Sequence, residues 1–509
     1  MSRNLVAKAA VSSCKRRVHV SLTSTTTATS IPPSSSAMSE ATITIPWLLD
    51  NCVSLRHPTG QRGANFYSEK GGAASVVLPK EVLSVDLLQC SPDAASESND
   101  MIRGGALPTC VRSLEAAKVT TTTTAPTPTA ATLTTEVSSP LTALLRVQFS
   151  EGKVSYVPFH SIDKYVLMKP SAIPWGGPTS KPPVTTAKAV HRVNYDDVMG
   201  GVVTGAGGGD LESDRIKACG LKRTPAVYNL LRRLAADGLA VVEGCGVGEE
   251  AVKCLAAVVG GTGMPLHTMY GTHWHVQSAP VTGPKNNVAY STTSLDLHQD
   301  LVYHESMPGV QLLHCQSFHS SVKGGLSSFL DINVWMKRFK MLHPEAYAVL
   351  TKVPAAFMKD DMEREEPAQY YYATPHIHEN DQGEFLKLFW APAFEAPLPI
   401  RDPDVAEQYY AARGKMCDVM QELVEESSPE CKAVRFQLKE GDCVMFLQGR
   451  MMHGRDAFTE ESACSRRLHG AYVELESFRN KVTSLAVEHK DEEALLCGDL
   501  CQFFNRSYR

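Results

Sequence analysis

The sequence predicts an α+β fold that is mostly β: a double-stranded β-helix (jelly-roll) domain with flanking helices, preceded by a small β-rich N-terminal domain. Short apolar runs of strand character recur at irregular spacing in the second half of the chain. The tripeptide His298-Gln299-Asp300 and the distant His453 suggest one site built from strands far apart in the sequence. Helical periodicity is confined to a few segments between the strands.

The expected elements follow in chain order. Apolar residues at helical spacing predict a helix over residues 226–236, and Gly238-Leu239-Ala240-Val241-Val242 predicts a short buried strand. Residues 309–315 and 443–447 are expected to be core strands, the second after a Gly441-Asp442 turn. Residues 404–426 are expected to form a helix.

Composition divides the chain into four parts. These are a basic, Ser/Thr-rich segment (1–40), the N-terminal domain (41–168), a proline-rich linker (169–190) and the main domain (191–509). The N-terminal domain contains a Thr/Ser/Ala/Pro-rich insertion at about 91–139 that we expect to be disordered. The first segment has no acidic residue before Glu40, which favours a mitochondrial targeting segment; a disordered basic tail on a cytoplasmic protein is the alternative.

Overall composition limits the functional class. The 509-residue chain is 43% hydrophobic and carries a net charge of −5, so nothing predicts a nucleic-acid partner. No apolar run approaches the ~20 residues of a membrane span. The 14 cysteines are irregularly spaced, which is typical of reduced thiols inside a cell.

Candidate metal ligands are His298, Asp300 and His453. On an extended strand the histidine and the aspartate of a His-x-Asp tripeptide point to the same face. Two imidazoles and one carboxylate can hold Fe(II) and leave three coordination positions open, as in non-haem iron oxygenases. A metal hydrolase could use the same residues, so the triad alone leaves both possibilities open.

Several further motifs occur in order with this triad. They are Asn287-Val288-Ala289-Tyr290, Pro308-Gly309-Val310-Gln311-Leu312-Leu313-His314-Cys315, Met452-His453-Gly454-Arg455 and Ser465-Arg466-Arg467-Leu468-His469-Gly470-Ala471-Tyr472. With them, residues 190–485 resemble the γ-butyrobetaine and trimethyllysine hydroxylase family, closest to the γ-butyrobetaine branch. The resemblance implies an Fe(II)- and 2-oxoglutarate-dependent dioxygenase that uses O₂, is supported by ascorbate and is typically a homodimer.

Arg466 stands where the resembled family anchors the far carboxylate of 2-oxoglutarate, and Leu313 matches a position that lines the co-substrate pocket. A planar guanidinium can meet a carboxylate with two parallel hydrogen bonds, which a lysine cannot do. Neighbouring residues on a strand face opposite sides, so only one of Arg466 and Arg467 can point inward. The resemblance favours Arg466.

Four aromatic residues match the family's cage around a trimethylammonium group: Tyr270, Trp274, Tyr290 and Tyr472. A quaternary ammonium has no N–H to donate, so it is recognised by ring faces. Asn287 matches the γ-butyrobetaine branch. Among the remaining histidines, His314 is expected to be a hydrogen-bonded core residue, whereas His273 and His275 could belong to the pocket or to the surface.

Two departures from the family are visible. The stretch that usually carries two asparagines for the substrate reads Leu386-Lys387-Leu388-Phe389-Trp390-Ala391-Pro392-Ala393, so Lys387 or another donor would replace them. In the N-terminal domain, Cys52 alone remains of the cysteine cluster that binds a structural zinc, and Lys153 stands at the histidine position. An ammonium group cannot bind zinc, so we predict that this zinc is absent.

The expected reaction is therefore hydroxylation of a betaine, with γ-butyrobetaine to L-carnitine as the first candidate for carnitine biosynthesis. Hydroxylation of trimethyllysine or of another betaine by the same chemistry is the nearest alternative. A non-catalytic relative that binds a quaternary amine is the alternative from another class.

Overall fold

The structure is a computed structural model. It describes residues 4–15, 17–25, 38–50, 66–67, 75–76, 80–89, 133–137, 143–150, 152–158, 183–200, 210–261, 265–277, 289, 291–362, 365–380, 383, 385–459 and 466–491. The chain divides into two compact units, residues 1–169 and 170–509.

The first unit is built from small antiparallel sheets. One has the strand order β3-β2-β1-β7 and another the order β6-β8-β9. The strands of these sheets are β1 (Asn4–Val11), β2 (Arg17–Thr25), β3 (Met38–Thr44), β6 (Val82–Gln89), β7 (Leu133–Val137), β8 (Ala143–Phe149) and β9 (Val154–Pro158). The unit also contains the short strands β4 (Phe66–Tyr67) and β5 (Ser75–Val76), and helix α1 (Ile45–Asp50).

The expectation of disorder needs correction at two places in this unit. Within the segment expected to be targeting-like or disordered, Asn4–Val11 and Arg17–Thr25 form β1 and β2. Within the insertion expected to be disordered, Leu133–Val137 form β7, which pairs with β1. The physical reason is that Val18 and Val20 alternate into a buried position, and valine and threonine favour the pleated strand conformation. A low content of large apolar residues concealed this alternation.

The second unit contains a six-stranded sheet of order β10-β11-β22-β14-β25-β12, which we call the major sheet. A four-stranded sheet of order β13-β23-β16-β21 is the minor sheet. The strands of the major sheet are β10 (His191–Asn194), β11 (Leu239–Glu243), β12 (His273–Gln277), β14 (Val310–Phe318), β22 (Cys443–Leu447) and β25 (Arg466–Val473). Those of the minor sheet are β13 (Leu295–His298), β16 (Ser327–Asp331), β21 (Val434–Phe436) and β23 (Met451–Arg455).

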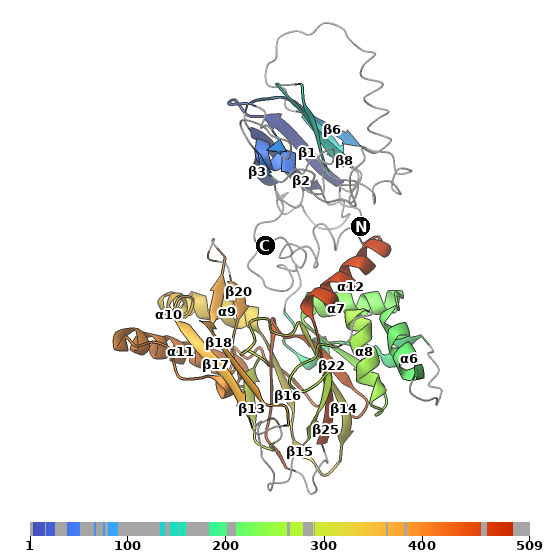
Figure 1. Cartoon of the computed structure of the whole chain (residues 1–509), viewed down its shortest axis with the longest axis vertical. Coiled ribbons are helices and arrows are strands. Elements are labelled where there is room, and N and C mark those ends of the chain that lie inside the picture. Colours follow the sequence, from blue (N-terminus) through green and yellow to red (C-terminus); the bar gives the residue numbers. More distant parts are fainter. Residues whose placement is uncertain are drawn as a thin grey trace. The chain divides into compact units, whose positions relative to one another are not determined.

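The two sheets share a core. Val241, Val444 and Phe446 of the major sheet pack in one buried cluster with Phe329 and Met451 of the minor sheet. From β13 onward the chain passes repeatedly between the sheets, through β14, β16, β22, β23 and β25, as Figure 1 shows for most of these strands. This strand path is the one that the predicted double-stranded β-helix requires.

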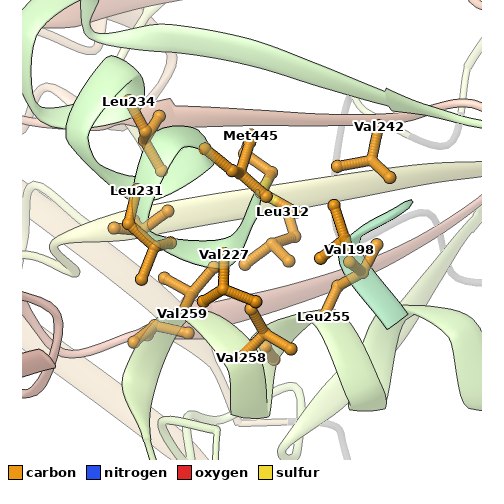
Figure 2. Close-up of a cluster of buried hydrophobic side chains, with 14 of the residues drawn as sticks. Val198, Val227, Leu231, Leu234, Val242, Leu255, Val258, Val259, Leu312 and Met445 are labelled. Atoms are coloured by element: carbon orange, nitrogen blue, oxygen red, sulfur yellow. The ribbon is translucent and has the colours of Figure 1, made fainter. Parts of the chain in front are cut away.

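Helices cover the opposite face of the major sheet. The intervening side chains of the same strands, such as Val242, Leu312 and Met445, pack against Leu231 and Leu255 of helices α7 (Pro225–Asp237) and α8 (Glu250–Gly260), as Figure 2 shows. Thr224 begins α7 by accepting from the Val227 N–H. Helices α5 (Tyr195–Met199), α6 (Asp210–Gly220) and α12 (Leu475–Glu488) lie in the same part of the chain's second unit.

The segment of the chain between β16 and β21 forms a further group of helices and strands. It contains helices α9 (Ile332–Leu342), α10 (Pro344–Leu350) and α11 (Pro403–Val424), and the strand pairs β17 (Pro354–Asp361) with β18 (Ala368–Pro375) and β19 (Ile377–Glu379) with β20 (Phe385–Leu388). The short strands β15 (Lys323–Gly324) and β24 (Phe458–Thr459) also pair, and two 3₁₀ turns cover Ala187–Ala189 and Pro392–Phe394. Among the helices described, none has both the length and the apolar character of a membrane crossing.

The regular elements predicted for the main domain are confirmed to within three residues at their ends. The helices expected at 226–236 and 404–426 are α7 and α11, and the strands expected at 238–242, 309–315 and 443–447 are β11, β14 and β22.

Candidate functional site

The three predicted metal ligands converge. His298 ends β13 and pairs in the minor sheet with His453 of β23. One ligand atom from each of His298, Asp300 and His453 lies within 4.8 Å of the other two. Nε2 of His298 is 3.4 Å from Oδ1 of Asp300, and Nε2 of His453 is 3.8 Å from Oδ2. His298 and His453, which are far apart in the sequence, are thus brought together by two adjacent strands.

The His-x-Asp spacing predicts that Asp300 lies on the same strand as His298, and this prediction is wrong. Asp300 follows the end of β13, and the chain then turns at Leu301, whose φ of 56° is in the left-handed region. A bulky residue seldom adopts this conformation, and such strain is often found at functional sites. The turn, and not strand geometry, directs the carboxylate of Asp300 toward the two imidazoles.

The chemistry of these donors fits a divalent metal ion. Nδ1 of His298 donates to the carbonyl of Asp296 at 2.7 Å, so Nε2 is the nitrogen that faces Asp300 and could bind a metal ion. Burial lowers the pKa of His453 to about 3, so its imidazole is neutral and able to bind metal. Burial alone would raise the pKa of Asp300, but the His453 and His298 imidazoles outweigh it and lower that pKa below its usual range.

Two neutral donors hold the second oxygen of the Asp300 carboxylate. Nε2 of Gln311 donates to Oδ2 at 2.8 Å, and the Tyr472 hydroxyl donates to the same atom at 2.7 Å. These bonds fix the rotation of the carboxylate and leave Oδ1 facing His298. The arrangement therefore presents one carboxylate oxygen and two imidazole nitrogens to a common point, as a facial iron site requires.

A cavity of about 280 Å³ adjoins the three ligands. Arg466 and Leu313, the two residues expected at the 2-oxoglutarate position, both line it. The Arg466 side chain is buried, and its guanidinium carbon lies 5.4 Å from the centre of the Phe458 ring. A buried guanidinium of this kind can pair with a carboxylate through two parallel hydrogen bonds.

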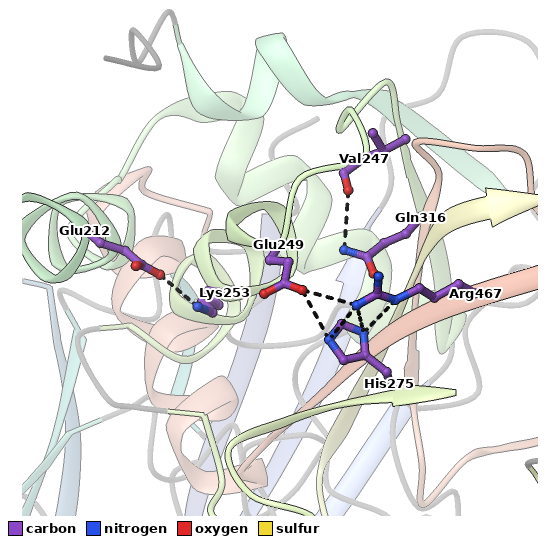
Figure 3. A network of polar contacts seen from close by, with 7 residues as sticks. All are labelled: Glu212, Val247, Glu249, Lys253, His275, Gln316 and Arg467. Carbon is purple, nitrogen blue, oxygen red and sulfur yellow. Dashed lines mark hydrogen bonds and ion pairs between the residues drawn. The ribbon is translucent and has the colours of Figure 1, made fainter. Parts of the chain in front are cut away.

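Strand alternation assigns the two adjacent arginines as predicted. Arg466 points into the cavity, whereas Arg467 points to the other face of β25 and forms an ion pair with Glu249 at 3.2 Å. Arg467 also contacts the ring of His275 (Figure 3). Because its guanidinium is engaged outside the cavity, Arg467 is not available to bind a co-substrate there.

Three of the four expected cage residues line the cavity: Tyr270, Trp274 and Tyr472. The Trp274 and Tyr472 rings stack with centroids 4.0 Å apart. Gly470 permits this arrangement, since an added Cβ would lie 2.6 Å from Cε2 of Trp274. Tyr290 and Asn287 lie outside the described residues, so the structure does not test their predicted roles.

Several cavity residues were not assigned a role from the sequence. Tyr303 and Phe394 add aromatic surface, with ring centroids 5.3 Å apart, and Gln311 adds the amide that bonds Asp300. The signal for Gln311 was present, because a polar residue interrupts the apolar run of β14 on the same face as Leu313. Nothing in the local sequence distinguishes Tyr303 or Phe394 from ordinary core aromatics.

The stretch that departs from the family also reaches the cavity, through Pro392, Ala393 and Phe394. Lys387, which had been suggested as a replacement donor, is not among the cavity-lining residues and lies with Nζ 4.4 Å from the centre of the Phe389 ring. We define residues 390–394 as the wall segment. In this structure it presents an apolar and aromatic surface to the cavity.

Arg455 holds the segment that leads into β13. Its guanidinium donates to the carbonyls of Ser291 at 2.8 Å and Thr293 at 2.5 Å, and its side chain also lines the cavity. These bonds connect β23, which carries His453, to the residues that precede His298. The positions of both histidines are therefore linked by a side chain as well as by strand pairing.

His273, His275 and His314 are not among the residues that line the cavity. His314 is fully buried and its Nε2 contacts the Gly246 carbonyl at 2.8 Å, which confirms the expected core role. His273 and His275 point to the outer face of β12, opposite Trp274, and His275 stacks on His469 at 4.4 Å. The sequence left open whether His273 and His275 belong to the pocket or to the surface, and the structure favours a position outside the pocket.

The zinc position of the N-terminal domain is described only in part. Lys153 is exposed in the turn between β8 and β9, where its carbonyl accepts from the Phe149 N–H at 2.9 Å. Cys52 lies outside the described residues. The absence of a structural zinc therefore stays a prediction.

Comparison with known protein families agrees with the site. Residues 221–472 match the family described as taurine catabolism dioxygenase TauD, TfdA family. This range includes all three metal-ligand candidates, Arg466 and the three described cage residues.

Individual relatives are similar over part of their length. Dioxygenase str8 of Strobilurus tenacellus is 29% identical over 216 residues, covering 41% of this chain and 46% of that protein. Human γ-butyrobetaine dioxygenase is 31% identical over 215 residues, covering 41% of this chain and 50% of the relative. Mouse mitochondrial trimethyllysine dioxygenase is 24% identical over 279 residues, covering 53% of this chain and 60% of the relative. The match thus spans about half the length of the first two relatives.

Among solved structures, the non-haem iron oxygenase OrfP in complex with Fe and α-ketoglutaric acid matches with a TM-score of 0.40 and 13% identity. That match covers 56% of this chain and 94% of OrfP.

Proposed function

We propose that this chain, whose residues 221–472 belong to the TauD/TfdA dioxygenase family, hydroxylates a trimethylammonium substrate with Fe(II), O₂ and 2-oxoglutarate. This proposal rests on the convergence of His298, Asp300 and His453 beside a cavity that is also lined by Arg466 and stacked aromatic rings. A metal hydrolase would need neither the buried arginine nor the rings.

Each group has a separate task in this proposal. His298, Asp300 and His453 would hold Fe(II), and Arg466 would bind the far carboxylate of 2-oxoglutarate. When bound, iron with 2-oxoglutarate supplies the oxidising chemistry: one O₂ is consumed, one oxygen atom enters the substrate C–H bond and the other enters succinate, with release of CO₂. Gln311 and Tyr472 hold the Asp300 carboxylate in place throughout.

The aromatic rings that line the cavity would bind the cationic end of the substrate. Tyr270, Trp274 and Tyr472 offer ring faces that attract a quaternary ammonium electrostatically. Because the cation is held at a fixed position, a fixed carbon of the substrate would face the metal site. With γ-butyrobetaine as substrate, the product would be L-carnitine.

Trimethyllysine or another betaine is the second candidate. The wall segment favours keeping it, since Pro392, Ala393 and Phe394 present no amide side chain where the family's asparagines would stand. The name of the Strobilurus relative, dioxygenase str8, specifies no substrate. A substrate panel separates these candidates.

The test is anaerobic reconstitution with Fe(II), followed by turnover in air with 2-oxoglutarate, ascorbate and γ-butyrobetaine, trimethyllysine or no amine. We expect succinate, and a gain of one oxygen atom on γ-butyrobetaine that is lost in Asp300→Ala. Succinate without oxidation of either amine would retain the dioxygenase but reject these substrates. Iron-loaded, folded protein that forms no succinate would favour the non-catalytic amine-binding alternative.

For the cellular location we propose mitochondria, with the cytoplasm as the alternative. The first forty residues are basic and contain no acidic residue before Glu40, and the mouse trimethyllysine relative is named as mitochondrial. The strands β1 and β2 in this segment pair with β3 and β7, so its removal would expose two strand edges. Import of the full chain into isolated mitochondria, followed by mass measurement, tests both location and processing.

A further inference from the structure

We propose that Gln299 and Gln448 are positioning residues that join the metal-binding tripeptide to the wall segment, and thereby keep 2-oxoglutarate turnover coupled to substrate hydroxylation. This inference rests on the proposed dioxygenase function. Gln299 is the residue between the two metal ligands His298 and Asp300, and Gln448 lies directly after β22. Both side chains are fully buried.

Gln299 bonds the wall segment through its backbone and its side chain together. Its N–H donates to the Trp390 carbonyl at 2.8 Å, and its Oε1 accepts from the Trp390 N–H at 3.0 Å. Both backbone polar groups of Trp390 are therefore satisfied by one residue of the metal-binding tripeptide. Trp390 adds a third bond from its indole Nε1 to the Leu297 carbonyl at 3.1 Å.

The side chain of Gln448 completes the connection to Asp300. Nε2 of Gln299 donates to the Gln448 carbonyl at 3.0 Å, and Nε2 of Gln448 donates to the Asp300 carbonyl at 2.8 Å. The path thus runs from Trp390 through two glutamines to the backbone of a metal ligand. Because the side chains of Gln299 and Gln448 are buried, a lost hydrogen-bond partner costs about 1–3 kcal/mol.

The wall segment is also held from its other side. Arg413 lies over the Trp390 ring at 4.9 Å and donates to Glu395 at 2.9 Å, and Trp335 contacts the Trp390 ring edge-on at 5.5 Å. Trp390 is therefore a rigid support, from which Pro392, Ala393 and Phe394 extend to the cavity. Movement of Asp300 relative to this support requires breaking buried hydrogen bonds.

Glutamine suits position 299 for a specific reason. The side chain must accept from one backbone group and donate to another, and it must be long enough to reach both. Glutamate could not donate to the Gln448 carbonyl, and methionine has the length but neither polar group. Reactive geometry is sensitive at this scale, since a displacement of about 1 Å between substrate and reacting group can cost about 10²-fold in rate.

The experiment compares Gln299→Met with wild type and with Gln316→Met. Gln316 is a matched control, because it is also buried and bonds one carbonyl, that of Val247 at 3.3 Å, on the outer face (Figure 3). The ratio of hydroxylated amine to succinate is measured with the iron-loaded enzyme. Hydrogen exchange of a peptide covering residues 385–395 is measured in the metal-free protein.

We expect the coupling ratio of Gln299→Met to fall about tenfold, while succinate formed without amine changes less than about twofold, and exchange near Trp390 to accelerate. Gln316→Met should match wild type in both readouts. The ratio is counted per succinate, so partial unfolding does not alter it. If Gln299→Met does not fold, Gln448→Met, which removes only the bond to the Asp300 carbonyl, is measured in the same way.

Faster exchange with an unchanged coupling ratio would show that the glutamines support only the fold, and would overturn the proposal. Unchanged exchange would overturn it as well, since the contact itself would be missing. Failure of wild-type protein to form succinate is a different result: it counts against the proposed function, and the exchange measurement still tests the connection.

Discussion

The hydroxyl of Tyr472 donates to Oδ2 of Asp300 at 2.7 Å, while the ring of the same residue stacks on Trp274. One side chain therefore contacts both a metal ligand and the proposed cage for the substrate cation. Sequence comparison with the family suggested only the cage role. The two roles can be separated, because the hydroxyl and the ring are different parts of the side chain.

Tyr472→Phe should lower kcat about tenfold and leave the KM for the amine within about twofold. A hydrogen bond to a charged group contributes about 1.5–3 kcal/mol, and its loss frees the carboxylate to rotate, whereas the ring remains. Steady-state kinetics with the preferred amine measures kcat and KM separately. Tyr228→Phe is the matched control, since Tyr228 donates to Asp491 at 2.8 Å and is not a cavity residue. A rise in KM without a fall in kcat would contradict the dual role.

Arg466→Lys should raise the KM for 2-oxoglutarate by about tenfold to a hundredfold, because an ammonium cannot form the paired bonds of a guanidinium. The KM for the amine should change little. Arg467→Lys, on the next residue but the opposite face, should leave both constants near wild type. Equal effects of the two substitutions would show that Arg466 acts through charge or folding and not through co-substrate binding.

Gly470→Ala should weaken selection for a positive charge in the substrate. The new methyl group would lie 2.6 Å from the Trp274 ring, which must then move from its stacked position. We expect about 1 kcal/mol less discrimination between a trimethylammonium substrate and its neutral tert-butyl analogue. Competition kinetics measures that difference. Gly414→Ala in α11, where an added Cβ meets nothing within 4 Å, is the control.

His376 should make the protein less stable in mild acid. Burial lowers the pKa of His376 to about 4, from an ordinary value of 6.5. Because the unfolded chain binds the proton more tightly, the contribution is fully present above pH 6.5 and is lost as pH falls toward 4. Between pH 7 and pH 5 the loss is about 2 kcal/mol.

Urea unfolding of wild type and His376→Gln at both pH values isolates this contribution. His376 contacts the Phe389 carbonyl at 2.7 Å and the Tyr409 hydroxyl at 2.8 Å, and glutamine keeps one donor and one acceptor without titrating. The free energy of unfolding should therefore fall less with pH in the variant. Parallel pH dependence in the two proteins would assign the acid sensitivity to other groups.

Much of the site was predictable because it depends on local rules. Alternation along a strand required that only one of Arg466 and Arg467 point inward, and the family resemblance selected Arg466. Family resemblance supplied the pairing of the tripeptide with His453. These inferences need only a strand and its two faces.

The rest depends on contacts that no local pattern records. The side chain of Gln299 meets Gln448, 149 residues away, and a glutamine in sequence gives no sign of which carbonyl it will reach. The turn at Leu301 was missed because a leucine with positive φ is rare. The N-terminal strands were missed for the opposite reason, since small and β-branched residues without large apolar neighbours resemble a disordered tail.

β25 carries Arg466, the proposed co-substrate anchor, and Tyr472, a proposed cage residue, on one face and six positions apart. At about 3.3 Å per residue, the backbone between them is about 20 Å long and cannot be shortened without changing faces. Loss or gain of a single codon within this strand would turn one of the two side chains outward. Evolution can therefore alter the substrate by replacing residues at these positions, whereas insertions and deletions are confined to the loops at the ends of the strand.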